Sequence, residues 1–217
     1  KGSLLSPSFV EGVAWEPRQR LAYLADAYAG LLVVGLPAGR PPRVLGRLAT
    51  GVATHDVALW GRRAFLADAG AGLRAVDIGN PMQPRELGLA DSPGEALGLA
   101  LDPARGLAFL ADGPGGLSIF DISGAGAPRL LATLPAEGYA WSLRLDDAAG
   151  LIYLADRQRG LRVIDVAQPE APRHLALYGE AGGLFELALD GSRAFAGAGA
   201  GGLWLLGGRA GPAAGPG

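Results

Sequence analysis

The feature that most restricts the fold of this chain is a sequence unit that recurs five times. It reads LAYLADAYAGLLVVGL from Leu21 to Leu36 and returns as RAFLADAGAGLRAVDI, LAFLADGPGGLSIFDI and LIYLADRQRGLRVIDV, beginning at residues 63, 107 and 151. A degenerate copy, RAFAGAGAGGLWLLGG, begins at Arg193. The copies are spaced by 42, 44, 44 and 42 residues, measured on Gly30, Gly72, Gly116, Gly160 and Gly202. A period of about 40 to 45 residues is the length of one four-stranded blade of a β-propeller.

Each copy predicts two β-strands joined by a tight turn. Leu21 to Asp26 is rich in strand-forming and aromatic residues and ends in a polar turn that closes at Gly30. Leu31 to Leu36 is apolar at nearly every position, which is typical of a strand covered on both faces. One more apolar stretch precedes each copy, and a more polar stretch follows a Pro-Arg connector in the first four copies. Each unit therefore predicts four strands.

We accordingly predict an all-β chain that forms a single β-propeller domain of five four-stranded blades. The blades are expected at about residues 9–49, 53–90, 96–134, 140–178 and 184–206, followed by a Gly/Pro-rich tail at 207–217. The fifth copy lacks a fourth strand, and we expect residues 1–6 to complete it, with Gly2 to Ser6 as the strand, because an open ring would expose sheet edges and apolar surface. The alternative is that the chain belongs to a larger propeller.

The pattern YLAD, a short turn, GLRVIDV and the connector QPEAP resembles the LVIVD repeat proteins, a family of bacterial and archaeal β-propellers often found outside the cytoplasm. The resemblance covers about Phe9 to Leu206, with departures at Gly35, where later copies have Asp, and in the degenerate last copy. It implies a propeller fold and an extracytoplasmic location, in the periplasm, at the cell surface or secreted. The start at Lys1 fits a mature form after signal-peptide removal or a trimmed chain.

Composition excludes several classes of function. The net charge is −2, with 19 basic and 21 acidic residues, so no nucleic-acid partner is expected. The sequence has no run of 18 or more apolar residues, so no membrane-spanning segment is expected. The absence of cysteine excludes disulfides and thiolate metal sites, and the two histidines, His55 and His174, are too few for a histidine-based zinc site.

Residues that recur in every blade are interpreted as structural. The aspartates of the LAD motif begin a tight turn, where the carboxylate accepts backbone N–H groups and the following glycine supplies a positive φ; they are Asp26, Asp68, Asp112 and Asp156. The aromatic residues that share one register are interpreted as packing between blades; they are Tyr23, Phe65, Phe109, Tyr153 and Phe195.

Function is expected where the copies differ, near the start of each inner strand. Asp56, Arg144 and Glu186 occupy positions at which other copies have small residues. Because neighbouring strands alternate in direction, the entrance to the first strand shares a face with the hairpin between the second and third strands. The candidates for binding a ligand or partner on this face are Glu11, His55, Asp56, Glu95, Tyr139, Trp141, Arg144, Glu186, Tyr28, Arg157 and Arg159.

These polar residues allow two interpretations. In the first, they satisfy one another's hydrogen-bonding groups around the axis, and Arg144 forms a structural ion pair with Asp56 or Glu186. Alternatively they line a ligand-binding mouth, because Trp141 and Tyr139 beside acids and an arginine resemble the lining of small-ligand or peptide sites.

Three functional hypotheses follow. The first is a non-catalytic binding or assembly module, outside the cytoplasm, that presents a propeller face to a protein partner or complex subunit; no catalytic residue and no cofactor is expected, because His55 has no Ser or Cys partner at a recognisable nucleophile elbow. The second is a small-ligand or glycan binder at the axial mouth. The third is a metal-dependent hydrolase or lactonase in which Glu11, Asp56 and Glu186 hold Ca²⁺. The sequence does not predict an oligomeric state.

Overall fold

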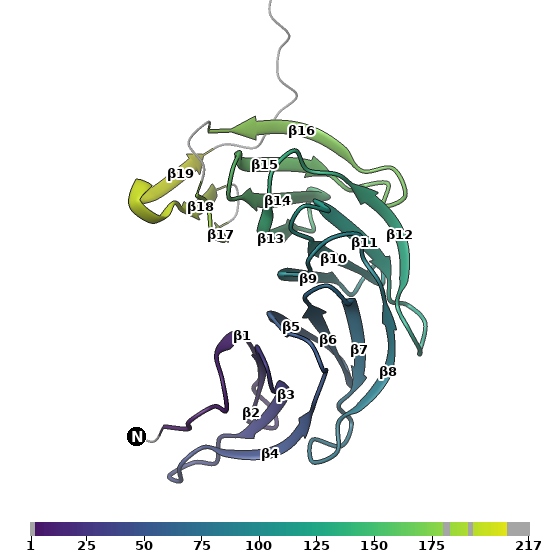
Figure 1. Ribbon diagram of the computed structural model, residues 1–217, viewed down its shortest axis with the longest axis vertical. Helices are drawn as coiled ribbons and strands as arrows, with labels where there is room; N and C mark the ends of the chain where they lie inside the picture. The colour runs from purple at the N-terminus through teal and green to yellow at the C-terminus, as the bar shows by residue number, and fades with distance from the viewer. Residues whose placement is uncertain (1–2, 180–182, 191–192, 208–217) are drawn as a thin grey trace, which may run out of the picture.

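The computed structural model describes residues 3–179, 183–190 and 193–207. In this part of the chain every regular element is a β-strand, apart from one 3-10 turn, η1 (Gly199–Gly201). The strands form five antiparallel sheets, each made of consecutive strands, and the sheets are arranged like propeller blades along an arc (Figure 1). The predicted all-β propeller architecture is confirmed. Among the described residues no helix is long and apolar enough to cross a membrane.

The first strand of each blade lies nearest the axis and the last lies at the periphery (Figure 1). Blade 1 comprises β1 (Val10–Glu16), β2 (Leu21–Asp26), β3 (Gly30–Gly35) and β4 (Arg43–Leu48). Blade 2 comprises β5 (Asp56–Trp60), β6 (Arg63–Asp68), β7 (Gly72–Asp77) and β8 (Arg85–Ala90). Blade 3 comprises β9 (Gly98–Asp102), β10 (Leu107–Ala111), β11 (Leu117–Asp121) and β12 (Arg129–Leu134). Blade 4 comprises β13 (Ala140–Asp146), β14 (Leu151–Asp156), β15 (Gly160–Asp165) and β16 (Arg173–Tyr178). Blade 5 comprises β17 (Glu186–Asp190), β18 (Arg193–Gly197) and β19 (Leu203–Gly207).

The hydrophobic core lies between neighbouring blades. Tyr23 and Leu31 of blade 1 form one cluster with Val57 and Leu66 of blade 2, and similar clusters join blades 2 to 3, 3 to 4 and 4 to 5. The aromatic register is buried in the first four blades, at Tyr23, Phe65, Phe109 and Tyr153. This confirms the predicted packing role in these blades. The third strands of blades 1 to 4 are buried along nearly their whole length, which explains why they are mostly apolar.

The aspartates of the LAD motif are fully buried, and each carboxylate is satisfied. The backbone N–H of Ala29 donates to Asp26 Oδ1 at 3.0 Å, and those of Gln158 and Arg159 donate to Asp156 Oδ1 at 2.9 and 3.0 Å. The predicted turn-capping role is confirmed in these two blades. In blades 2 and 3 the carboxylate binds hydroxyls instead: Thr54 donates to Asp68 at 2.6 Å, and Ser92 and Ser118 donate to Asp112 at 2.7 and 2.9 Å.

The amino-terminal segment does not complete blade 5. Residues 3–8 form no strand, and the hydroxyls of Ser6 and Ser8 both donate to Asp26, which holds the segment on blade 1. The expectation that Gly2 to Ser6 closes the ring is therefore wrong for residues 3–6; Gly2 lies outside the described residues. The reason is local, because blade 1 has Leu32 where blades 2 and 4 have Arg74 and Arg162. Asp26 thus takes its side-chain partners from the amino-terminal segment.

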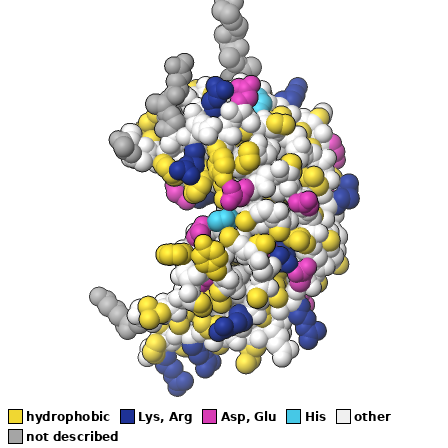
Figure 2. Space-filling view, viewed as in Figure 1, with side chains coloured by type: hydrophobic (Ala, Val, Ile, Leu, Met, Phe, Trp, Pro, Cys, Tyr) yellow, Lys and Arg dark blue, Asp and Glu magenta, His cyan; other side chains and the backbone are white. Residues whose placement is uncertain are grey.

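Both ends of the arc leave a blade face uncovered. Val13 of blade 1 is 62% exposed, whereas Val57, in the same register of blade 2, is 5% exposed. At the other end Leu205 of blade 5 is 60% exposed, whereas Ile119, its equivalent in blade 3, is fully buried. The opening between the two ends is visible in the space-filling view (Figure 2).

Candidate functional site

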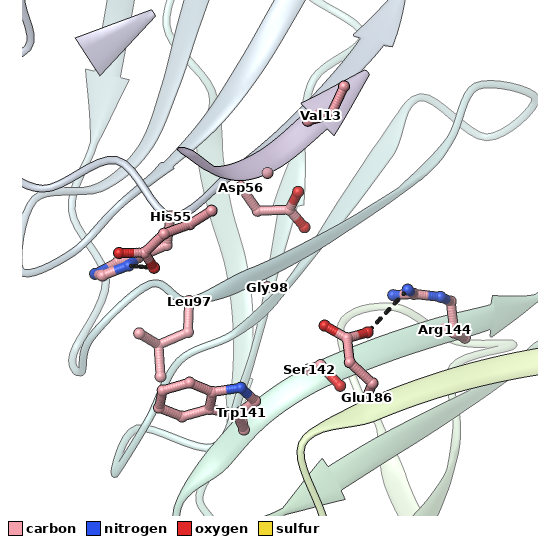
Figure 3. Close-up of a pocket in the computed structure, with 11 residues that line it drawn as sticks. Val13, His55, Asp56, Leu97, Gly98, Trp141, Ser142, Arg144 and Glu186 are labelled. Carbon is pink, nitrogen blue, oxygen red and sulfur yellow. Dashed lines mark hydrogen bonds and ion pairs between the residues drawn. The ribbon is translucent and has the colours of Figure 1, made fainter. Parts of the chain in front are cut away.

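A cavity of about 440 Å³ lies at the axis, and the first strand of every blade contributes to its lining. Because the inner strands of successive blades converge on one axis, side chains that are 42 to 44 residues apart in the sequence lie close together. The lining residues come from β1, the starts of β5 and β9, β13 and β17; they are Glu11, Gly12, Val13, His55, Asp56, Leu97, Gly98, Trp141, Ser142, Arg144 and Glu186 (Figure 3).

The structure confirms that strand entrances and hairpins share one face. The Ala27 N–H, in the hairpin after β2, donates to the Phe9 carbonyl just before β1 at 2.8 Å. The same bond recurs in blade 4, where the Arg157 N–H donates to the Tyr139 carbonyl at 2.9 Å. We call this the strand-entrance face.

Two side-chain contacts, a hydrogen bond and an ion pair, cross between blades at the cavity. His55 Nδ1 lies 2.6 Å from Glu11 Oε2, which joins blade 2 to blade 1. Arg144 Nη2 lies 3.4 Å from Glu186 Oε2, which joins blade 4 to blade 5 (Figure 3). The ion pair predicted for Arg144 therefore forms with Glu186. The Arg144–Glu186 pair reduces the net negative charge that the cavity presents.

Asp56 is held by the backbone. Its carboxylate accepts the Val57 N–H at 2.8 Å and the Leu99 N–H of the next blade at 3.0 Å. Burial raises the pKa of Asp56 above its ordinary value, although the two backbone hydrogen bonds act to lower it. Gly12 makes the close approach possible, because a Cβ at this position would lie 2.8 Å from Asp56 Cα.

Ser142 is a buried polar residue in the cavity wall. It is 7% exposed, and among the described residues its Oγ is the one buried side-chain oxygen or nitrogen with no hydrogen-bond partner. An unsatisfied buried hydroxyl costs roughly 1–3 kcal/mol, so such groups are rare away from functional sites.

An aromatic cluster lies beside the cavity. The Arg157 guanidinium carbon lies 4.5 Å from the centre of the Trp141 ring and 4.9 Å from that of Phe185. The Trp141 and Phe185 rings meet edge to face at 6.1 Å, and Tyr139 lies 6.4 Å from Trp141. We call these four residues, Tyr139, Trp141, Arg157 and Phe185, the aromatic rim.

Glu95 fixes the outer edge of the aromatic rim. The Tyr139 hydroxyl donates to the Glu95 carboxylate, linking blade 4 to blade 3. This hydrogen bond, together with burial, raises the pKa of Tyr139 from 10.0 to about 12. Tyr139 is therefore a hydrogen-bond donor throughout the physiological pH range.

The remaining candidates are not brought to the cavity. Tyr28 is 78% exposed on the hairpin of blade 1. Arg159 lies 3.2 Å from Glu137, an exposed pair on the same face.

Sequence reasoning omitted Val13, Leu97 and Phe185 from the candidates. Leu97 and Phe185 share the inner-strand register of Glu11, His55 and Trp141, so the alignment of the copies contained the signal. Attention to polar residues alone excluded these apolar side chains.

The three carboxylates proposed for calcium, Glu11, Asp56 and Glu186, line the same cavity but are not arranged as a metal site. Among the residues that the structure describes, no group of three or more His, Cys, Asp or Glu side chains is placed to hold a metal ion. Glu11 is bonded to His55, Asp56 to backbone amides and Glu186 to Arg144, so each is committed to a different partner.

The repeated blades and the axial cavity define this chain as a β-propeller repeat protein. The LVIVD repeat profile matches residues 51–91, 106–133 and 137–178, together just over half of the sequence. The chain belongs to the LVIVD repeat family, as the sequence pattern predicted. No curated protein matches the sequence.

Solved structures share the fold at low sequence identity. The computationally designed Ika8 protein superposes with a TM-score of 0.72 at 12% identity, covering 91% of this chain and 58% of its own. This chain thus spans little more than half of that protein. A chain of the Nidogen/Laminin complex superposes with a TM-score of 0.66 at 20% identity, covering 91% of this chain and 75% of its own.

Proposed function

We propose that this protein is a non-catalytic protein-binding module whose docking surface is the aromatic rim on the strand-entrance face. A propeller built from these repeats fits a protein-interaction module at the level of the fold. The observation that carries the finer proposal is the stack of Arg157 on Trp141 and Phe185, at 4.5 and 4.9 Å. Trp, Tyr and Arg are the residues enriched at the energetic centres of protein interfaces.

The geometry of the rim supports docking in a second way. Arg157 is exposed, while Trp141 and Phe185 are partly buried beneath it, so rigid aromatic surface is presented at low entropic cost. The structural relative from the Nidogen/Laminin complex was solved as a complex between proteins, so this fold supports such interactions in another protein.

The arrangement around His55 supports a non-catalytic role. Its Nδ1 is bonded to Glu11, and the nearby Ser142 hydroxyl makes no hydrogen bond among the described residues. The hydrogen bond between nucleophile and base that activates a serine is therefore not formed between these two.

We also propose an extracytoplasmic location, which rests on the family resemblance alone. Fractionation of the source cells tests it: recovery of the protein with periplasmic, surface or secreted material is expected, and recovery with cytoplasmic markers would contradict it.

The docking proposal is tested by cross-linking the protein in its native fraction, identifying the partner and measuring its affinity in purified form. We expect Arg157→Ala and Phe185→Ala each to weaken binding by about ten-fold or more. Trp15→Ala is the matched control, because Trp15 is 48% exposed at the opposite end of β1. A partner whose affinity is unchanged by both rim variants, or no partner at all, would overturn the proposal.

A further inference from the structure

We propose that the axial cavity binds a neutral, polyhydroxylated molecule of about the size of a monosaccharide. This site shares Trp141 with the aromatic rim, but Tyr139, Arg157 and Phe185 do not line the cavity, so ligand and protein partner contact largely different residues. The volume of about 440 Å³ falls within the roughly 300–1,000 Å³ of small-molecule sites.

The charges of the cavity indicate a neutral ligand. Glu11 is hydrogen-bonded to His55, and Glu186 is ion-paired with Arg144, so two carboxylates of the lining already have side-chain partners. Asp56 accepts two backbone N–H groups, and burial favours its neutral form. The lining therefore offers many hydrogen-bonding atoms, and each of its three carboxylates already has a partner in the protein, which suits hydroxyl groups better than an ion.

Ser142 provides an independent indication of a hydroxylated ligand. Its hydroxyl is buried in the cavity wall, and no described residue satisfies it. A ligand hydroxyl both donates and accepts hydrogen bonds, as the serine does, and would supply the partner once the Ser142 side chain turns from its buried rotamer towards the cavity. Without a ligand the serine costs stability, which is a measurable property of the free protein.

The apolar part of the cavity matches the non-polar face of a sugar ring. Figure 3 shows Trp141 and Leu97 close together on one side, with Asp56, Glu186 and Arg144 on the others. The Trp141 ring is held in place by Arg157 at 4.5 Å. An aromatic wall opposite polar side chains orients a ring that has C–H groups on its face and hydroxyls at its edge.

The test uses the full chain and a panel of neutral probes: glucose, galactose, mannose, N-acetylglucosamine and myo-inositol. Binding is measured by saturation-transfer NMR and by tryptophan fluorescence. We expect at least one probe to bind in the millimolar range or tighter, while acetate, phosphate and ethylamine do not. Ser142→Ala and Trp141→Phe should each weaken that binding by about ten-fold, and the control Trp15→Phe should leave it unchanged.

Ser142→Ala carries a second readout that keeps the test sharp if binding is weak. The variant should raise the melting temperature of the free protein, because it removes an unsatisfied buried hydroxyl, while it lowers affinity for the probe. Three results would each overturn the proposal: no binding of any neutral probe, binding of the charged probes instead, or binding that both cavity variants leave unchanged. Ser142→Ala also distinguishes the two sites, because Ser142 lies outside the aromatic rim: it should weaken probe binding and leave protein docking unchanged.

Discussion

At the scale of single residues, the same buried carboxylate recurs in four blades with different partners. Asp26 is satisfied by two serines of the amino-terminal segment, and Asp156 by Arg162 at 2.9 Å. Arg74 and Ser118 play the corresponding role in blades 2 and 3. The fold therefore requires a satisfied carboxylate at this position, and the chemistry of its partner is free to vary.

Removal of Arg162 should destabilise the protein strongly. Burial acts to raise the pKa of Asp156, but the Tyr139 and Gln158 N–H groups and Arg162 outweigh it, so the pKa lies below its ordinary value. Arg162→Ala leaves this carboxylate buried without its cation, and we expect a loss of about 3 kcal/mol in the free energy of unfolding near pH 7. Urea denaturation measures the loss. Since the folded-state pKa is depressed, the contribution of Asp156 is present above the unfolded pKa and is lost as the pH falls through the folded pKa.

The matched control is Arg173→Ala in the same blade. Arg173 lies 2.8 Å from Asp165, but its side chain is 74% exposed, so we expect a change below about 0.5 kcal/mol. Equal losses of unfolding free energy in the two variants would show that burial does not determine how much each ion pair contributes to stability.

The hydroxyl of Tyr139 should lose its proton at a higher pH than an ordinary tyrosine. Its pKa of about 12 in the folded protein exceeds the ordinary 10.0, so its contribution to stability is full below pH 10 and is lost as the pH rises towards 12. The difference in phenolate absorbance between the wild type and Tyr139→Phe isolates this group from the other tyrosines. Glu95→Gln removes the negative acceptor and should move the titration towards 10.0. A titration that Glu95→Gln does not shift would contradict the assigned hydrogen bond.

At the scale of elements, the repeat made the strands predictable and left the chain ends unpredictable. The apolar run from Leu31 to Leu36 predicts a strand covered on both faces, and β3 is buried at every position. The path of residues 3–8 depends instead on Ser6 and Ser8 reaching one carboxylate, a contact that occurs once and leaves no periodic signal. Closure of the ring was inferred from a general penalty on exposed edges, and this single local contact outweighed it.

Equivalent valines in blades 1 and 2 give a direct measure of blade packing. Val57 is 5% exposed between two blades, so Val57→Ala should cost about 2 kcal/mol through lost burial and a residual cavity. Val13 has the same register but is 62% exposed, so Val13→Ala should change stability by less than about 0.5 kcal/mol. Thermal and urea unfolding compare the two. A large cost for Val13→Ala would show that the face of blade 1 is covered in solution.

At the scale of the whole molecule, the candidate site depends on the convergence of the inner strands along the arc of blades. Aligning the copies placed Glu11, His55 and Trp141 in one register, and the structure brings them to one cavity. The choice of partner for each charge was not predictable, because it depends on distances between blades: Arg144 reaches Glu186 while Asp56 turns to backbone amides. Apolar lining such as Leu97 was missed because its register pointed to the site while its residue type is typical of ordinary core.

The repeat architecture predicts a gradient of local stability along the arc. In stacked repeats each unit is stabilised by its neighbours, so a blade with one uncovered face should open more often than one covered on both faces. Ile119 of blade 3 is fully buried, whereas Leu203 and Leu205 of blade 5 are 70% and 60% exposed, and blade 5 has three strands in the described part of the chain. Hydrogen exchange followed by mass spectrometry should therefore show slow exchange in β10 and β11 and faster exchange in β18.

Blade 1 should exchange at an intermediate rate, because Ser6 and Ser8 hold the preceding segment against its buried Asp26. Replacing both serines, Ser6→Ala with Ser8→Ala, should speed exchange in blade 1 without affecting blade 3. Uniform protection across the five blades would instead mean that the ends of the arc are covered in solution and that the chain opens as one cooperative unit.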